Sequence, residues 1–292
     1  MKRTTKQKLT PYMFVLPNLL VFGIFIIYPA FYGLYISFTE WDIISSPNFV
    51  GISNFINIFN NPNFLDTLQR TFIYVGISVP LMFVLALVLA IGLDKKIRGR
   101  GAFRAIFYMP AMLSFIIIGV SWKWILGDNF GIVNYILEYF GLQTVSWLTT
   151  PTLAFIIVIL VTVWARAGYF MVIFLAGLQS ISNIYYEAAE IDGASKWQQF
   201  IHITLPMLKP TSLVVLVLST ISVFKMFDLI IALTQGGPGR ATTFLVQDIY
   251  LMAFDRGNLG LASAMSVVLF VILSILTIIQ FKVSARGGNA YE

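Results

Sequence analysis

The chain has 292 residues, of which 58% are hydrophobic and 11% charged, and its net charge is +6 with a mean hydropathy of +0.85. A typical soluble domain is about 25% charged, so this composition excludes a soluble enzyme, a disordered tail and a nucleic-acid-binding module. Uncharged stretches longer than the roughly 20 residues that cross a bilayer are Leu9–Thr39, Thr71–Leu93, Tyr139–Ala165 and Gly257–Phe281. They indicate an integral membrane protein.

Six apolar segments are expected to be membrane-spanning helices, which predicts an all-α membrane protein. The expected spans are Tyr12–Phe38, Thr71–Leu93, Arg104–Leu126, Pro151–Leu175, Thr211–Leu233 and Leu261–Phe281. The first is too long for a signal peptide and is interpreted as a retained helix. Residues 1–11 then form a basic N-terminus, 12–281 one six-helix domain, and 282–292 a short tail.

The distribution of Lys and Arg predicts the orientation in the membrane. Thirteen of these residues fall in segments on the side of the N-terminus, against three (Arg70, Arg240 and Arg256) on the opposite side. Positive charge concentrates in cytoplasmic loops, so both termini are expected to be cytoplasmic. The outer segment Glu40–Arg70 contains Val50–Phe59, whose apolar spacing predicts a short interfacial helix.

The long cytoplasmic segment at about 176–209 contains a patterned run of small and acidic residues. Tyr186–Ile191 is expected to be a short helix, Gly193 to permit a sharp turn, and Ala194–Ile203 to form a second helix. The small side chains leave a low surface on which another protein can dock, and the acidic ones suit a basic partner. The residues predicted to dock are Glu187, Ala188, Ala189, Asp192, Gly193, Ala194, Ile203, Leu205 and Pro206.

This run resembles the EAA loop of permeases in binding-protein-dependent ABC importers. That loop reads EAA, three residues, G, nine residues, then I-x-L-P, and Glu187–Pro206 meets every fixed position. Pro29–Trp41, Phe49–Gly51, Arg98–Arg104 and Gly177–Ile181 also resemble carbohydrate-type permeases. The chain is similar to the first of the two paired permeases in the maltose-system family.

The resemblance implies a type I ABC importer in the inner membrane of a bacterium or archaeon. Its expected partners are a second homologous permease, two cytoplasmic ATPases, an extracellular sugar-binding protein and a sugar or sugar-derivative substrate. A Walker A motif, G-x-x-x-x-G-K-[ST], does not occur in this sequence, so ATP and Mg are expected to bind the partner ATPase. No enzyme activity, cofactor or catalytic residue is expected in this chain, and with no Cys and His202 as its single His, no metal site.

Charged residues inside the predicted spans have two interpretations. Arg166 lies near the middle of the fourth span, where charge is costly unless it faces the bundle interior or water. It could pair with Asp228, and Lys225 could pair with Asp228 along one helix at i, i+3. Alternatively, polar residues of these two helices line a substrate pathway, as the family resemblance implies; the candidates are Thr162, Arg166, Tyr169, Ser219, Ser222, Lys225 and Asp228.

The outer segment Gln235–Gly260 is expected to meet the binding protein. It contains the turn-rich run Gly236, Gly237, Pro238 and Gly239, followed by Phe244–Phe254, whose apolar positions suggest a short interfacial helix. A passive connector is the alternative for this segment. For the whole chain the alternative function is a secondary transporter or channel subunit for a small polar solute, although such proteins often show internal repeats and none is visible here.

Overall fold

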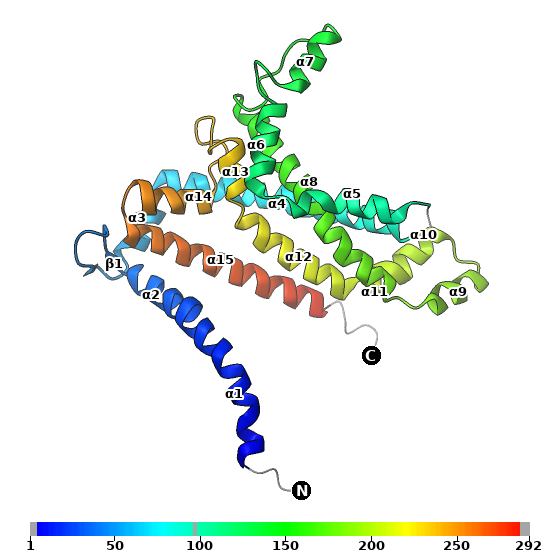
Figure 1. The fold of residues 1–292 in the computed structure, drawn as a ribbon, viewed down its shortest axis with the longest axis horizontal. Helices are drawn as coiled ribbons and strands as arrows, with labels where there is room; N and C mark the ends of the chain where they lie inside the picture. Colours follow the sequence, from blue (N-terminus) through cyan, green and yellow to red (C-terminus); the bar gives the residue numbers. More distant parts are fainter. Residues whose placement is uncertain (1–4, 96–97, 287–292) are drawn as a thin grey trace. The chain divides into compact units, whose positions relative to one another are not determined.

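The computed structural model describes residues 5–95 and 98–286, which are mostly helical (Figure 1). In this part of the chain four helices are long and apolar enough to cross a membrane, or up to six if each of two bent helix pairs is one span. The residues group into two compact units, 1–65 with 249–270 and 66–248 with 271–292. The expected basic N-terminus and tail lie partly outside the described residues.

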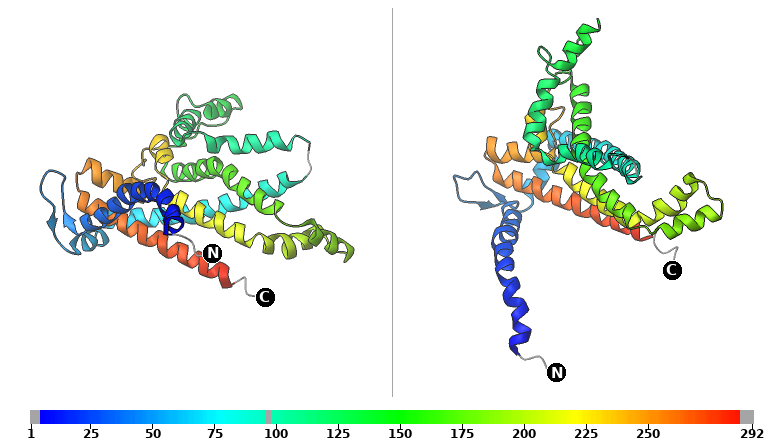
Figure 2. Two further views of the ribbon diagram at one scale, coloured as in Figure 1. Left: turned by 60° about the horizontal axis from the view of Figure 1, so that its bottom comes forward. Right: turned by 45° about the vertical axis from the view of Figure 1, so that its right-hand side comes forward.

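The first unit begins with one continuous helical segment, which confirms the expected helix at Tyr12–Phe38. It consists of α1 (Thr5–Phe22), a π-helical turn η1 (Gly23–Ile27) and α2 (Tyr28–Ile36). A two-residue hairpin, β1 (Thr39–Glu40) with β2 (Asn48–Phe49), follows the end of α2 and pairs antiparallel (Figure 2). Along most of this segment the apolar side chains from Met13 onward stay exposed, as expected of a helix that faces lipid or another subunit.

The segment after the hairpin contains the predicted short helix, α3 (Ser53–Phe59). Asn54 anchors α3, because its buried Nδ2 donates to the carbonyl oxygens of Ser37 (3.0 Å) and Thr39 (2.8 Å). In the hairpin loop, Ser45 donates from both Oγ and N to the Asp42 carboxylate, and these bonds lower the pKa of Asp42. The expected long outer segment is therefore compactly folded.

Helix α4 (Pro62–Asp94) starts well before the expected Thr71, so the last residues of the expected outer segment Glu40–Arg70 are already helical. The Asn61 side chain accepts from the Asn63 amide at 3.0 Å, and the Asn61 carbonyl oxygen accepts from the Phe64 amide at 3.1 Å. Asn is a favourable residue at a helix start because its side chain satisfies a free amide. Because α4 begins at Pro62, the charged residues Asp66 and Arg70 are part of this helix.

The second unit is built around α8 (Pro151–Gln179), whose buried residues recur along its length. Helix α8 packs along α5 (Arg100–Met112), as Figure 1 shows. The approach is close: a Cβ on Gly168 would stand 1.9 Å from the Phe107 carbonyl oxygen. Small residues let membrane helices approach this closely, so the helix contact depends on glycine at this position.

The expected third span, Arg104–Leu126, is not one helix. Helix α5 ends at Met112, and α6 (Phe115–Ile125) continues at an angle of 98°. Pro110 lies in the last turn of α5 and removes one backbone donor, and Leu113 and Ser114 are extended. Helix α6 then packs against α13 (Asp228–Leu233).

The expected fifth span, Thr211–Leu233, is also interrupted. Helix α12 (Lys209–Phe224) ends at Phe224, and α13 begins at Asp228. An acidic side chain is stabilising in the first turn of a helix because it complements the macrodipole, so Asp228 favours a new start there. The possible pairing of Lys225 with Asp228 along one helix is not formed among the described residues: the helix is interrupted between them, and no ion pair within 4 Å joins them.

The remaining helices complete the described chain. Helix α15 (Leu259–Arg286) extends the expected sixth span at both ends. The other elements are α7 (Ile132–Tyr139), α9 (Asn183–Ile191), α10 (Lys196–Gln199), η2 (Phe200–Thr204), α11 (Leu205–Met207), α14 (Leu245–Tyr250) and η3 (Leu251–Asp255). Helix α14 with η3 confirms the helix expected within Phe244–Phe254.

Candidate functional site

The motif segment Glu187–Pro206 forms the helix–turn–helix that its sequence predicts. Helix α9 ends at Ile191 with Asp192 as its C-cap, and Gly193 takes φ +76°. The Gly193 amide donates to the Glu190 carbonyl oxygen (3.1 Å) and the Ala194 amide to that of Ala189 (2.8 Å). These two bonds are the Schellman motif, which needs a left-handed residue after the helix end and therefore favours glycine.

The second helix of the motif begins at a capping box. The Ser195 Oγ accepts from the Gln198 amide (3.3 Å), and the Gln198 Oε1 accepts from the Ser195 amide (2.7 Å). Lys196 donates to the Glu190 carboxylate across the turn, and this bond holds the pKa of Glu190 below its ordinary value. The turn is thus held by bonds between residues close in sequence.

The motif presents both charge and apolar surface. Glu187, Ala188, Asp192 and Gly193 are exposed, whereas Ala189, Ala194, Ile203 and Pro206 are half-buried and Leu205 is just exposed. Sequence reasoning missed three exposed apolar side chains beside them: Ile184 (72%), Ile191 (87%) and Trp197 (68%). The signal in the sequence that could have identified them is the occurrence of large apolar residues within an otherwise polar loop. Exposed apolar surface rimmed by charge is typical of a protein interface.

A cavity of about 390 Å³ lies between α8, α12 and α13, and its lining includes the α6 residue Phe115. Five of the seven predicted pathway residues line it: Arg166, Tyr169, Ser222, Lys225 and Asp228. The Arg166 guanidinium carbon stands 4.6 Å from the centroid of the Phe115 ring. The cavity therefore gathers hydroxyls, two cations and one carboxylate from helices far apart in sequence.

The other two predicted pathway residues lie elsewhere. Thr162 is fully buried and its Oγ1 is 2.8 Å from the Tyr74 hydroxyl, in a contact between α8 and α4. Ser219 is fully buried and donates to the Leu216 carbonyl oxygen of its own helix (3.1 Å). Neither belongs to the cavity lining. Both residues lie on the predicted face of their helix. However, the packing of the helices buries their side chains in protein contacts and not in the cavity.

The structural ion pairs considered for the cavity are not formed. Among residues 5–95 and 98–286 the ion pairs within 4 Å are Lys196–Glu190 and Arg240–Asp248. Arg166 does not pair with Asp228, because Asp228 starts a separate helix and is exposed. Within the same described ranges, no group of three or more His, Asp or Glu side chains could hold a metal ion.

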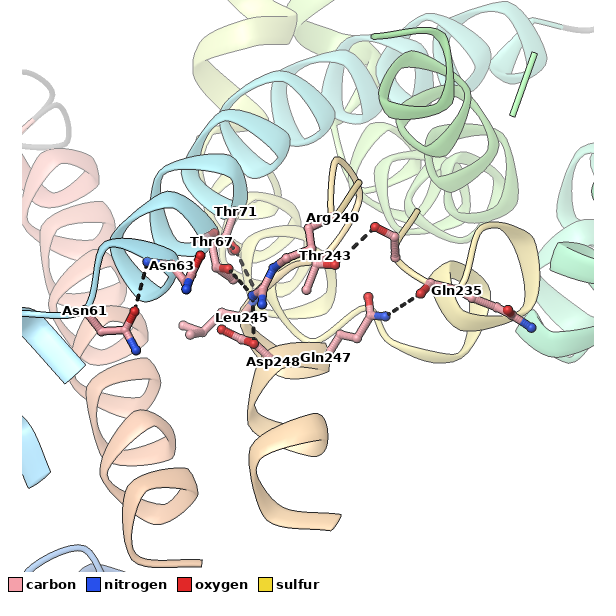
Figure 3. Close-up of polar contacts among 11 residues, drawn as sticks. Asn61, Asn63, Thr67, Thr71, Gln235, Arg240, Thr243, Leu245, Gln247 and Asp248 are labelled. Atoms are coloured by element: carbon pink, nitrogen blue, oxygen red, sulfur yellow. Dashed lines mark hydrogen bonds and ion pairs between the residues drawn. The ribbon is translucent and has the colours of Figure 1, made fainter. Parts of the chain in front are cut away.

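Residues 235–248, the first part of the expected outer segment Gln235–Gly260, are held by a partly buried polar network (Figure 3). Arg240 donates to the Asp248 carboxylate (2.9 Å) and to Thr67 Oγ1 (3.2 Å). The Leu245 amide donates to Thr71 Oγ1 at 3.0 Å. These contacts attach the segment to the first turns of α4.

The glycine-rich run lies at one edge of this network. Gly236 is buried and accepts from Thr243 Oγ1 (3.1 Å), while Gly237 and Pro238 are half-buried and Gly239 is exposed. The Gln247 side chain donates to the Gln235 carbonyl oxygen at 3.0 Å. Hydrogen bonds from Thr243 and Gln247 therefore hold the glycine-rich run and its neighbour Gln235 in place.

Comparison with known proteins identifies the family. Residues 49–287 match the family described as "Binding-protein-dependent transport system inner membrane component". The chain belongs to this family. The permease is 38% identical over 276 residues to the trehalose/maltose transport system permease protein MalF of Thermococcus litoralis, covering 93% of this chain and 92% of that protein. It is 35% identical over 280 residues to the sn-glycerol-3-phosphate transport system permease protein UgpA of Agrobacterium fabrum, covering 94% of each.

A solved structure supports the same assignment. The permease matches a chain of a bacterial alginate ABC transporter, crystallised with an alginate pentasaccharide-bound periplasmic protein, at a TM-score of 0.85. The two are 27% identical and 96% of each chain is covered. The resemblance to ABC importer permeases is therefore confirmed, as is the type I permease fold of a multi-pass inner-membrane protein. Membership of this family excludes the alternative interpretation of the chain as a secondary transporter or channel subunit.

Proposed function

We propose that this permease forms half of the translocation pathway of an ATP-driven importer for a sugar or sugar derivative. The printed names of similar proteins refer to trehalose and maltose, sn-glycerol-3-phosphate, and alginate. Each of these compounds carries more than one hydroxyl group on its carbon skeleton. A cavity that contains Tyr169 and Ser222 hydroxyls beside aromatic rings suits such ligands.

The chain is proposed to cross the membrane six times with both termini cytoplasmic. The bent pair of α5 and α6 then counts as one span. Helix α12, with α13 beyond its end, counts as the span that follows the motif segment. The excess of Lys and Arg on the side of the N-terminus supports this orientation.

Glu187–Pro206 is proposed as the surface that couples the permease to a separate ATPase, which binds ATP and Mg. The observation that carries this proposal is the exposed turn itself: Gly193 in the Schellman motif, with unburied Ile184, Ile191 and Trp197 around it. Acidic Glu187 and Asp192 flank this apolar surface. Two ATPase subunits and a second homologous permease would complete the membrane assembly.

The outer segment 235–248 is proposed to contact the sugar-loaded binding protein. Its buried network holds the run Gly236–Gly239 in one conformation, with Gly239 exposed. The alginate transporter that the permease resembles was crystallised with a periplasmic protein, which supports a partner of this kind.

The test of coupling replaces Gly193 with Val. A β-branched side chain is strongly disfavoured at φ +76°, so the turn between α9 and α10 is expected to distort. No atom outside the turn lies within 4 Å of the position of a Cβ, so the membrane helices should be unaffected. We expect loss of ATPase co-purification with unchanged insertion, measured in detergent-solubilised membranes.

The matched control is Gly141→Val. Gly141 has φ +73°, is exposed and has the same free space, but it follows α7, outside the motif. It should leave ATPase co-purification and binding-protein-stimulated ATP hydrolysis unchanged. Equal ATPase recovery in the two variants would refute the docking assignment.

A further inference from the structure

We propose that the 390 Å³ cavity selects a sugar that carries an oxyanion, either a carboxylate or a phosphate. This inference rests on the proposed function and narrows its substrate class. It follows from two features of the cavity lining: polar atoms that are buried without a partner, and a charge balance that is not neutral.

The first feature is the Arg166 side chain. Its guanidinium stands over the Phe115 ring, 4.6 Å from the centroid, so one face of the group contacts an aromatic ring. This cation–π contact leaves all the N–H donors in the guanidinium plane unused. Nε is buried without a hydrogen-bond partner, and Arg166 forms no ion pair among the described residues. The group is held in place, but its planar donors remain available.

A second orphaned atom lines the same cavity. The Ser222 Oγ on α12 is buried without a hydrogen-bond partner, as is Arg166 Nε on α8. Buried polar groups normally have partners in a protein or in ordered water. Two unsatisfied atoms on facing helices indicate that a polar ligand or water completes the site during transport.

The charge balance favours an anion as that ligand. The charged lining residues are Arg166, Lys225 and Asp228, which sum to one positive charge. Asp228 forms no ion pair among the described residues and can accept hydrogen bonds from sugar hydroxyls. A guanidinium binds carboxylates and phosphates through two parallel hydrogen bonds, which an uncharged sugar cannot match. An oxyanion on the substrate would therefore occupy the side of the cavity near Arg166.

The test measures the electrostatic potential in the cavity with a single engineered thiol. The native chain has no Cys, so Leu218→Cys, at an exposed lining position, supplies a unique label site. In the reconstituted importer the rates of modification by anionic methanethiosulfonate ethylsulfonate and by its cationic trimethylammonium analogue are compared. We expect Arg166→Gln to lower the anion-to-cation rate ratio by roughly tenfold, as removal of one nearby charge implies.

A matched control tests whether the change in the rate ratio is specific to the cavity, and a second variant repeats the test at another cation. Arg256→Gln removes an exposed arginine that is not part of the cavity and should leave the ratio unchanged. Lys225→Gln, at an exposed position between two helices, should also lower the ratio and serves if Arg166→Gln does not fold. An unchanged ratio in the folded variants overturns the inference.

Protection of the thiol then identifies the anion. Glucuronate and glucose 6-phosphate, added separately, distinguish a carboxylate from a phosphate, and at least one should slow modification of Leu218→Cys more than glucose does. Equal protection by glucose overturns the inference. That outcome leaves the proposed function intact, because glucose is itself a sugar and coupling to the ATPase is tested separately by co-purification.

Discussion

The motif segment Glu187–Pro206 and the outer segment 235–248 are both connections between membrane helices, but they are held in opposite ways. Between α9 and α10 the bonds join residues within a few positions of one another, such as Glu190 with Lys196. In the outer segment, Arg240 and Leu245 bond to Thr67 and Thr71, more than 170 positions away. The motif turn is therefore held by local bonds, whereas the outer segment is held by bonds to α4.

The largest effect is expected from Arg240→Met in the outer segment. The Asp248 side chain is 6% exposed and would lose its cationic partner. Leaving one charge of a buried pair uncompensated costs about 3–5 kcal/mol. The thermal unfolding midpoint of the purified permease should fall clearly, while Arg256→Met, at an exposed site, should not change it. Similar midpoints for both variants would mean that the network does not hold the segment.

A smaller effect is expected from Thr71→Val, which keeps the shape of the side chain. The Leu245 amide would lose its acceptor inside the protein, at a cost of about 1–3 kcal/mol in unfolding free energy. Thr71→Ser keeps the hydroxyl and should retain most of the stability. If Val and Ser give the same denaturation midpoint, the bond between α4 and the outer segment contributes nothing.

The smallest effect is expected in the motif turn, from Ser195→Ala. Loss of the capping box should cost about 0.5–2 kcal/mol, confined to α10. Amide hydrogen exchange should accelerate at Lys196–Gln199, whereas the global unfolding midpoint should not move. Ser195→Thr should preserve the protection. A fall in the global midpoint would show that the turn is coupled to the membrane helices after all.

The same contrast explains which elements could be predicted from the sequence. The turn at Gly193 and its two short helices depend on local residue types, and the prediction is confirmed. The breaks in the third and fifth spans were missed, because apolar composition is the same for a straight and a bent helix. Pro110 and Asp228 were visible signals, but α5 and α6 diverge as they pack against different partners, α8 and α13.

In the candidate cavity, too, the sequence predicts the face of the helix on which a residue lies but not what its side chain contacts. Helical periodicity placed Thr162, Arg166 and Tyr169 on one face of α8, yet Thr162 bonds to Tyr74 while the other two line the cavity. The choice depends on how near α4 approaches α8 at each turn. No periodicity within one helix contains that information.

The sequence by itself determined that this protein lies in a membrane, that it belongs among importer permeases, and where the turn of its motif segment begins and ends. These properties depend on composition and on residues near one another in the chain, so they survive without knowledge of the packing. Tertiary structure alone decided that the expected third span bends and the fifth is interrupted, that Arg240 reaches Asp248 and Thr67, and that Arg166 stands over Phe115 without a carboxylate partner. Each of these depends on the distance between helices, which side-chain volumes at close contacts such as Gly168 with Phe107 set.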